Sequence, residues 1–341
     1  MPDFVRIQVE DPSQIAEARR VARKQASHLG MAAPQLEQIA LVVTEAATNL
    51  LKHAGHGEIL IRNVREHDSG GFLALEVLVL DRGPGMADIE RCITDGYSTG
   101  SSPGQGLGAI TRHSPESDLY SAKSKGTAIF ARWPQKSNTG TVPSHLRPLR
   151  VGVVNVCKPG QEVCGDSVGI EHSGGQALVL VADGLGHGID AQTASLEAVS
   201  TLRAYPKETP KGLLELVHLA LRSTRGAAVA VARIDMERGI LQFAGVGNIS
   251  AQIYSGPKAS HHLVSLNGTA GHQIPRLQEF TYRWPAGALL VLHSDGLSSS
   301  TALDDYPRLA ARDPSLIAGI LYRDFSRYSD DSTVVVIKAA A

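Results

Sequence analysis

The chain has 341 residues, of which 43% are hydrophobic and 20% charged, so it is long enough for two cores of ordinary domain size. Its 33 Lys and Arg residues nearly balance its 34 Asp and Glu residues, which gives no electrostatic support to a broad surface for nucleic acid or membrane. The three cysteines, Cys92, Cys157 and Cys164, form no Cys-x-x-Cys pair and therefore argue against a disulfide framework or a structural zinc site.

The N-terminal residues lack the apolar core of a signal peptide, and no apolar run approaches the ~20 residues of a membrane span. We therefore expect a cytoplasmic protein that binds neither nucleic acid nor membrane.

The first half of the chain alternates strand-like and helix-like patterns. Asp11 and Pro12 supply an N-cap and a first-turn proline for the first predicted helix. A glycine-rich stretch from Asp81 to Gly104 is typical of irregular structure. The expected elements are a strand at 4–9, helices at 12–29 and 34–53, strands at 58–64 and 72–80, a helix from about 106, and a strand at 127–133. This order predicts a small α/β sandwich.

Polar, turn-forming residues from Gln135 to Ser144 separate two segments rich in apolar residues. We expect a first domain at 1–134, a linker at 135–148 and a second domain at 149–341. The second is dominated by β-branched and apolar runs, which predict strands at 151–156, 177–182, 227–234, 241–244, 250–254, 289–293 and 334–337, with helices at 189–203 and 211–222. Two sheets flanked by helices are the natural packing, and the fold class is α/β (α+β).

Glu45 and Asn49 lie one turn apart on a predicted helix, where a carboxylate and an amide can act on one ligand. By itself this spacing is more typical of a solvated helix face. Asp81 directly follows an apolar strand and can accept a hydrogen bond from an exocyclic amine. The glycines of this region, which let backbone approach a flat base or offer amides to phosphates, are Gly83, Gly85, Gly104, Gly106 and Gly108.

In this order, Glu45-x-x-x-Asn49, Asp81-x-Gly83-x-Gly85 and Gly104-x-Gly106-x-Gly108 resemble the N, G1 and G2 boxes of the GHKL (Bergerat) ATPase superfamily. The short stretch between the glycine boxes is similar to that of anti-sigma-factor serine kinases of the RsbW and RsbT type. The resemblance implies a GHKL α/β sandwich that binds ATP with Mg²⁺. Asn49 then helps to bind the magnesium ion, Asp81 reads adenine, the second glycine box cradles phosphate, and Glu45 is the candidate base for a protein hydroxyl.

In the second half, four aspartates stand at the ends of apolar runs: Asp166, Asp183, Asp295 and Asp330. Any one Asp-Gly pair is more often a simple turn, but strand ends can converge on one rim. Magnesium and manganese prefer oxygen ligands and keep several waters, so a few aspartates and a backbone carbonyl can hold two ions. The pattern predicts a metal-dependent hydrolase of phosphate esters.

The series Gly165-Asp166, Asp183-Gly184-Leu-Gly-His187-Gly188, Phe243-Ala-Gly-Val-Gly-Asn248, Ser294-Asp295-Gly296 and Asp330-Asp331-Ser-Thr333 resembles the SpoIIE and RsbX branch of the PPM serine/threonine phosphatases. This resemblance implies a four-layer αββα domain with two Mn²⁺ or Mg²⁺ ions. It further implies that Asp183 bridges both ions, that the Gly184 carbonyl and Asp166 complete one side, and that Asp295 and Asp330 hold the other.

Some assignments stay open from the sequence alone. His187 is either a general acid or a hydrogen-bonding neighbour of the ligands. Asp331 adjoins a ligand but should point the other way on an extended chain, so we leave it out of the set. Arg150 is a candidate for gripping the phosphate. His261 and His262 fit an exposed loop better than a zinc site.

The pairing of the two resemblances implies a bifunctional signalling protein in a partner-switching or stressosome pathway. Its expected partner is a STAS-domain antagonist protein, in phosphorylated and unphosphorylated forms, with a sigma factor as a further candidate; an oligomer is compatible with the sequence. In the alternative, the GHKL domain only senses ATP or binds a sigma factor, and the second domain alone is catalytic.

Overall fold

A computed structural model describes residues 4–66, 72–89, 106–135, 149–173, 175–274, 276–298 and 302–339. By their contacts, Pro2–Thr141 and Tyr306–Arg323 form one compact unit, which we call the N-terminal unit. Val142–Asp305 and Asp324–Ala341 form the other, the C-terminal unit. The predicted division at 1–134, 135–148 and 149–341 remains a proposal, and nothing in the sequence pattern indicated that Tyr306–Arg323 packs with the N-terminal unit.

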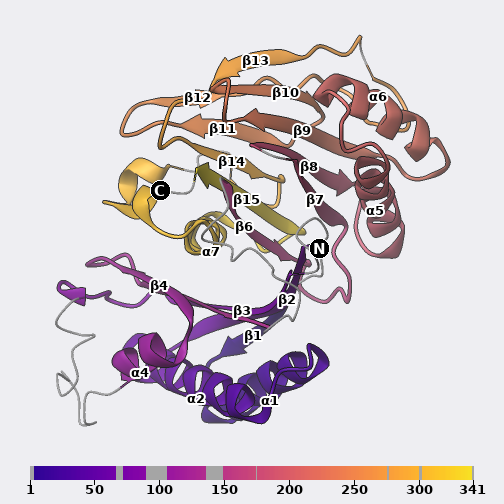
Figure 1. The fold of residues 1–341 in the computed structure, drawn as a ribbon. Helices are drawn as coiled ribbons and strands as arrows, with labels where there is room; N and C mark the ends of the chain where they lie inside the picture. Colours follow the sequence, from indigo (N-terminus) through magenta and orange to yellow (C-terminus); the bar gives the residue numbers. More distant parts are fainter. Residues whose placement is uncertain are drawn as a thin grey trace. The chain divides into compact units, whose positions relative to one another are not determined.

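The N-terminal unit is built on one antiparallel sheet with the strand order β1-β2-β3-β5-β4. Three helices, α1, α2 and α4, lie on one face of this sheet (Figure 1). The bounds are β1 Val5–Val9, α1 Pro12–His28, α2 Ala33–Asn49, β2 Gly57–Glu66, β3 Phe72–Leu80, α4 Gly106–His113, β4 Glu116–Ser121 and β5 Thr127–Pro134. This arrangement confirms the predicted α/β sandwich. Among the elements just named, β4 was not predicted, because its mostly polar sequence carries no strand-like alternation.

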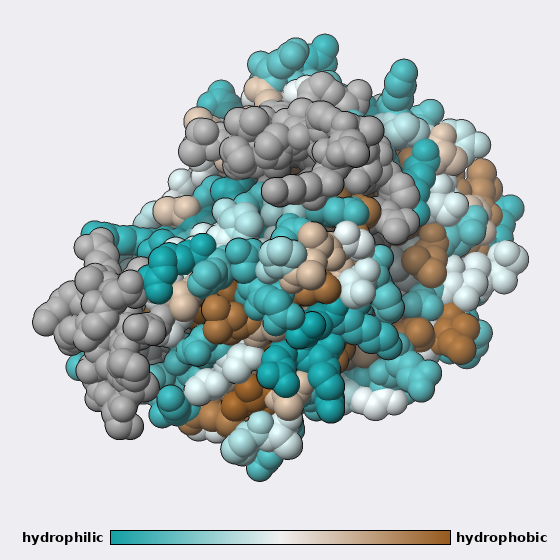
Figure 2. All heavy atoms as spheres, turned by 60° about the horizontal axis from the view of Figure 1, so that its bottom comes forward, coloured by the Kyte–Doolittle hydropathy of each residue, from teal (hydrophilic) through white to brown (hydrophobic). Residues whose placement is uncertain are grey.

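Local sequence fixes where the first helices begin and end. Asp11 caps α1 as predicted: its carboxylate accepts from the Ser13 amide at 2.9 Å, and Gln14 accepts from the Asp11 amide at 2.8 Å. Helix α2 continues into a π-helical turn at Leu50–Ala54. Alternate residues of β2 and β3 point into a core beneath the helices that contains Ile59, Ile61, Val77, Val79, Ile39, Val42, Val43 and Leu50. In Figure 2 the molecule is turned so that this helical side comes forward, and the visible surface is mainly hydrophilic with small separate hydrophobic areas.

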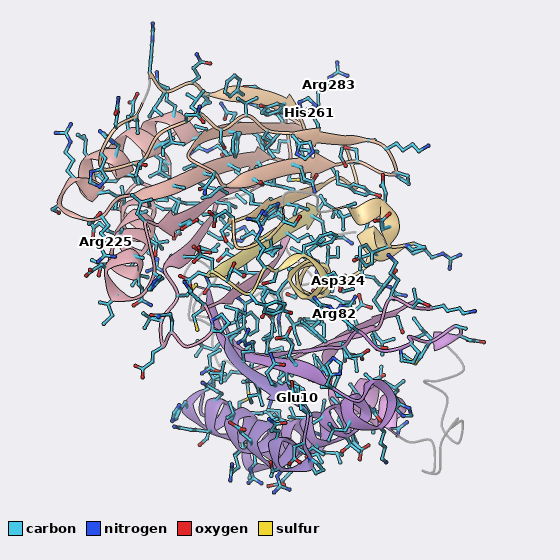
Figure 3. The ribbon with its side chains drawn as sticks, turned by 180° about the vertical axis from the view of Figure 1, so that it is seen from behind. Glu10, Arg82, Arg225, His261, Arg283 and Asp324 are labelled. Carbon is cyan, nitrogen blue, oxygen red and sulfur yellow. The ribbon has the colours of Figure 1, made fainter. Side chains whose placement is uncertain are left out.

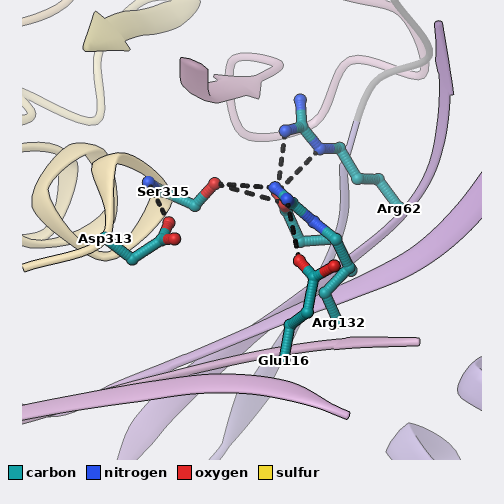
Figure 4. Close-up of polar contacts among 6 residues, drawn as sticks. Arg62, Glu116, Arg132, Asp313 and Ser315 are labelled. Carbon is teal, nitrogen blue, oxygen red and sulfur yellow. Dashed lines mark hydrogen bonds and ion pairs between the residues drawn. The ribbon is translucent and has the colours of Figure 1, made fainter. Parts of the chain in front are cut away.

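The same unit contains a buried ion cluster between the sheet and helix α7 (Pro314–Phe325) (Figure 4). Glu76 is fully buried on β3, and its Oε1 lies 2.7 Å from Arg62 Nη2. Its Oε2 accepts from Arg132 Nε at 3.1 Å and from the Ser315 hydroxyl at 3.2 Å. Burial raises the pKa of Glu76, but the adjacent Arg62 and Arg132 guanidinium groups outweigh it and lower that pKa below its ordinary value. A charged carboxylate can therefore remain inside the protein because two cations surround it.

The C-terminal unit contains two five-stranded sheets, with the orders β13-β10-β9-β8-β7 and β12-β11-β14-β15-β6. The bounds are β6 Leu149–Val156, β7 Asp166–Ser173, β8 Gln176–Gly184, α5 Ile189–Ala204, α6 Pro210–Ala220, β9 Ala227–Asp235, β10 Ile240–Val246, β11 Ser250–Tyr254, β12 Ser260–His262, β13 Phe280–Arg283, β14 Leu289–His293 and β15 Ser332–Ala339. Helices α5 and α6 lie beside the first sheet (Figure 1).

The alternation along β8 explains this layering. Ala177, Val179 and Val181 belong to the core that both sheets share, whereas Leu178 and Leu180 belong to a second core with α5 and α6. A strand buried on both faces has a continuous apolar sequence, which is why β8 was predictable. All the predicted strands and helices of this half are confirmed, while β7, β12, β13 and α7 were missed. Across the described ranges, no helix combines the length and apolar character needed to cross a membrane.

The buried ion cluster generates the first prediction. Glu76→Gln removes the charge that compensates two buried arginines, so we expect the free energy of unfolding to fall by about 3–5 kcal/mol. Urea unfolding of the full chain measures this. The matched control is Glu37→Gln, which removes an exposed ion pair with Arg23 of 3.0 Å and should change stability by less than about 1 kcal/mol. Equal effects of the two variants would contradict the assigned role of Glu76.

Candidate nucleotide and metal sites

The first candidate site lies where α2 meets the start of α4. Glu45 and Asn49 are both half-buried on α2. A Cβ atom added at Gly106 would lie 3.2 Å from Asn49 Nδ2 and 3.3 Å from Glu45 Oε2. The structure thus brings together two of the three sequence boxes, and the glycine leaves the first turn of α4 close to both polar side chains. Amides at such a helix start can bind phosphate.

Asp81 follows β3, as the sequence indicated. Its Oδ1 accepts from the amides of Gly83 at 2.8 Å and Thr127 at 3.1 Å. Burial raises the pKa of Asp81, and these two hydrogen bonds lower it in part. Because both bonds go to Oδ1, Oδ2 is the oxygen suited to accept from a ligand amine.

The glycines around Asp81 permit close backbone packing. Gly85 has a φ of +70°, and a Cβ atom there would lie 2.0 Å from the Ala122 carbonyl oxygen. A Cβ atom at Gly83 would lie 2.8 Å from Ala54 Cβ. Any larger residue at either position would displace the loop that carries Asp81. Gly108 is buried in α4, and Gly104 lies outside the described residues.

The second candidate site gathers the four predicted aspartates. Asp166 and Asp183 are direct partners in the antiparallel pair of β7 and β8. Burial, followed by the negative charges of Asp166, Asp295 and Asp330, raises the pKa of Asp183 to about 9. Burial also raises the pKa of Asp166 to about 7, although hydrogen bonds from Ser294 and Thr333 oppose the rise. Asp183 therefore lies close enough to the other three carboxylates for like-charge repulsion.

The second sheet places the remaining two carboxylates at one edge. Asp295 follows β14 and Asp330 precedes β15, and these strands are neighbours. Their ends are tied together by the Ser294 amide, which donates to the Thr333 carbonyl at 3.1 Å, and by the Thr333 amide, which donates to the Ser294 hydroxyl at 3.0 Å. Asn248 Nδ2 donates to Asp295 Oδ2 at 2.7 Å and orients it. Asn248 ends the motif Phe243-Ala-Gly-Val-Gly-Asn248, whose pattern alone does not indicate this contact.

The chemistry of this cluster fits divalent cations. Asp166 is 2% exposed, and its Oδ2 is buried without a hydrogen-bond partner. Such an orphaned oxygen among other carboxylates is suited to a hard cation, which would reverse the repulsion. Within the described ranges, no three His, Cys, Asp or Glu side chains are already arranged to hold a metal ion.

Gly184 and Asp331 have structural reasons for their positions. A Cβ atom at Gly184 would lie 2.0 Å from the Ala191 carbonyl oxygen, so only glycine allows α5 to begin so close to β8. Asp331 accepts from the Lys158 amide at 2.7 Å with Oδ1 and from the Gly165 amide at 2.8 Å with Oδ2. Both of its oxygens are engaged by the backbone, and it holds in place the loop that precedes Asp166.

Arg225, which the sequence analysis missed, lies beside the Asp183 loop. Its Nη2 makes an ion pair of 2.6 Å with Asp190 Oδ2 near the start of α5 (Figure 3). Its Nη1 would lie 3.2 Å from a Cβ atom at Gly186. Arg150 lies opposite Lys338 in the strand register, at the far end of β6. Val156, six residues further along β6, lies opposite Ser332 and so marks the end of the strand that is near Asp330. Six strand residues span about 20 Å, which argues against Arg150 as the phosphate contact.

Two known protein families match this chain, one in each half of the sequence. Residues 9–133 match the family described as histidine kinase-like ATPase domain, and residues 173–340 match the family described as stage II sporulation protein E (SpoIIE). The serine/threonine-protein kinase RsbT of Bacillus subtilis (strain 168) is 35% identical over 120 residues, which cover 35% of this chain and 88% of RsbT.

The C-terminal half has similar relatives of its own. The phosphoserine phosphatase RsbX of Bacillus subtilis (strain 168) is 25% identical over 154 residues, 45% of this chain and 76% of RsbX. The crystal structure of RsbX in complex with magnesium has a TM-score of 0.50 at 23% identity and covers 56% of this chain and 95% of that one, a likeness of fold. A structure from work on "the bacterial stressosome" has a TM-score of 0.52 at 28% identity, covering 56% and 99%.

The repulsion among the aspartates generates the second prediction. In the presence of a chelator near neutral pH, Asp183→Asn should leave the protein at least as stable as the parent, because a neutral amide replaces a carboxyl whose raised pKa shows that the folded chain disfavours its ionisation. With Mn²⁺ added, thermal unfolding of the parent should shift upward by several degrees while the variant shifts less. A parent whose unfolding temperature ignores Mn²⁺ would contradict the metal assignment.

Proposed function

Since the N-terminal part of this chain belongs to the family of the serine/threonine-protein kinase RsbT and its C-terminal part is a SpoIIE-type PPM phosphatase domain, we propose that it is a bifunctional switch. One unit phosphorylates a serine or threonine of a STAS-type antagonist protein, and the other removes that phosphate. The observation that carries the proposal is that Asp183 pairs with Asp166 across two strands and lies near Asp295 and Asp330, in the same chain as the cluster of Glu45, Asn49 and Gly106.

In the phosphatase unit, two Mn²⁺ or Mg²⁺ ions would supply a metal-activated water and would neutralise charge on the phosphoryl oxygens. Asp183 is the residue to hold both ions, with Asp166 and the Gly184 carbonyl on one side. Asp295 and Asp330 serve the other side, and Asn248 orients Asp295. The half-exposed Arg225 is placed to contact the substrate phosphate, because guanidinium groups match phosphate geometry.

In the kinase unit, ATP with Mg²⁺ is the proposed ligand. Asn49 contributes to the magnesium site, and Asp81 accepts from the adenine amine. The amides at the start of α4 would hold the phosphates, where Gly106 adds no side chain beside Glu45. Glu45 is then within reach of an incoming hydroxyl and acts as its general base.

The proposed partner proteins are suggested by the two protein families that the chain resembles. We assign a STAS-domain antagonist as the common substrate of both activities, in its unphosphorylated form for one and its phosphorylated form for the other. A sigma factor is the second candidate partner of the N-terminal unit. If that unit binds ATP but transfers no phosphate, the alternative of a sensing or sigma-factor-binding module replaces the kinase assignment.

A phosphatase assay tests the metal rim. With Mn²⁺ and a phosphoserine STAS protein, the parent chain should release phosphate, and Asp183→Ala should lower the rate at least about 100-fold because the shared ligand is lost. Glu237→Ala, an exposed acid beyond the end of β9, is the matched control and should retain the parent rate. Unchanged release by the Asp183 variant would refute the proposed site.

Phosphotransfer tests the other unit. Labelled ATP and an unphosphorylated STAS protein should yield labelled product, and Glu45→Ala should reduce the rate by about 10²–10⁴-fold while ATP binding persists. Glu37→Ala, on the exposed face of the same helix, is the control. Binding of ATP without transfer by the parent would sink the kinase assignment and favour the sensing module.

A further inference from the structure

The last residue of the segment Tyr306–Arg323 contacts the backbone around Asp81. Arg323 is 2% exposed, and its Nη1 donates to the Asp81 carbonyl at 2.7 Å and to the Thr127 carbonyl at 3.3 Å. Its Nη2 donates to the Lys125 carbonyl at 2.8 Å. The planar guanidinium thus joins the end of β3 to the turn that leads into β5.

These carbonyls belong to the backbone that positions the Asp81 side chain. The Asp81 amide donates to the Thr127 carbonyl at 3.0 Å, and the Thr127 amide donates to Asp81 Oδ1 at 3.1 Å. A Cβ atom at Gly126 would lie 2.0 Å from the Asp81 carbonyl oxygen, which shows how closely the two strand ends pack. Arg323 therefore binds the same two residues whose mutual bonds set the direction of the carboxylate.

The positive charge of Arg323 also acts on the ionisation of Asp81. Burial raises the pKa of Asp81, and the positive charge of Arg323 is among the influences that lower it again. An ionised carboxylate is an acceptor only, as an exocyclic amine requires, whereas a protonated one would also present a donor. The arginine thus favours the form of Asp81 that matches adenine.

We propose that Arg323 is a positioning residue of the nucleotide site, which holds the Asp81 backbone so that Oδ2 accepts from the adenine amine. This inference rests on the proposed ATP site of the N-terminal unit. The arginine lies 242 positions beyond Asp81 in the chain, between the proposed metal ligands Asp295 and Asp330. The nucleotide site is accordingly completed by a residue from the phosphatase half of the sequence.

Base specificity is the property that this role controls. Adenine offers an amine where guanine offers a carbonyl, so a well-held Asp81 carboxylate accepts from ATP and repels GTP. The contacts of the triphosphate at α4 are the same for both nucleotides. Loss of Arg323 should therefore weaken ATP binding about 10-fold, leave GTP binding nearly unchanged, and reduce the preference for ATP by a similar factor.

The test is equilibrium binding of ATP and of GTP to the full chain with Mg²⁺. Arg323→Met should reduce the ATP-to-GTP affinity ratio about 10-fold, and Arg323→Lys should restore part of it, because an ammonium can reach some of the carbonyls but not in the same plane. Asp81→Asn is the positive reference. The matched control is Arg312→Met, which removes an ion pair of 3.2 Å with Asp118 from the same segment and should keep the parent ratio.

The possible results distinguish the role of Arg323 from the existence of the nucleotide site. A parent ratio in Arg323→Met overturns the positioning role, even if the variant is less stable. Should Arg323→Met fail to fold, the lysine variant decides: a reduced ratio supports the proposal, and a parent ratio overturns it. A parent chain that binds no ATP overturns the proposed nucleotide site together with this inference.

Discussion

The fold of the C-terminal unit has to overcome the repulsion between carboxylates that it buries close together. Asp166 and Asp183 face each other across one strand pair, and Asp295 and Asp330 add their charges from the neighbouring sheet. Gathering carboxylates of like charge disfavours folding, and the hydrogen bonds that they accept offset this only in part. The fold must therefore supply the necessary free energy from elsewhere, through two apolar cores and through backbone bonds such as those that Asp331 accepts. Stored repulsion of this kind is suited to a site that gains stability when cations bind.

The N-terminal unit also buries charged groups, but it combines charges of opposite sign. Its buried charges are of both signs, and Glu76 balances Arg62 and Arg132 within a network of hydrogen bonds. At the proposed nucleotide site, backbone amides bind the carboxylate of Asp81, and glycines allow the close approach. Both units thus place one functional carboxylate at the exit of a buried strand and use the adjacent loop to orient it.

The sequence was informative wherever the chemistry is local. The apolar runs of β8 and β14 and the cap at Asp11 follow from residue type and spacing. So do the positions of Asp183, at the end of β8, and of Asp295, shortly after β14. Residues whose roles depend on distant partners could not be predicted in this way. Arg225 and Arg323 carry no motif, because an isolated arginine has no preferred spacing. Edge strands such as β12, with its three exposed residues, also lack an alternating pattern to read.

Helix α7 was also missed, and the chain reaches it by leaving one unit and entering the other. The chain leaves the second sheet after β14, contributes Tyr306–Arg323 to the N-terminal unit, and returns to form β15. The polypeptide therefore passes between the two units three times rather than once. A fragment that ended at the linker would lack α7, so Glu76 would lose its hydrogen bond from Ser315. The fragment that began there would contain α7 without the sheet against which it packs. Because Tyr306–Arg323 lies within the second half of the sequence but packs with the first, expressing either half alone would divide the N-terminal unit.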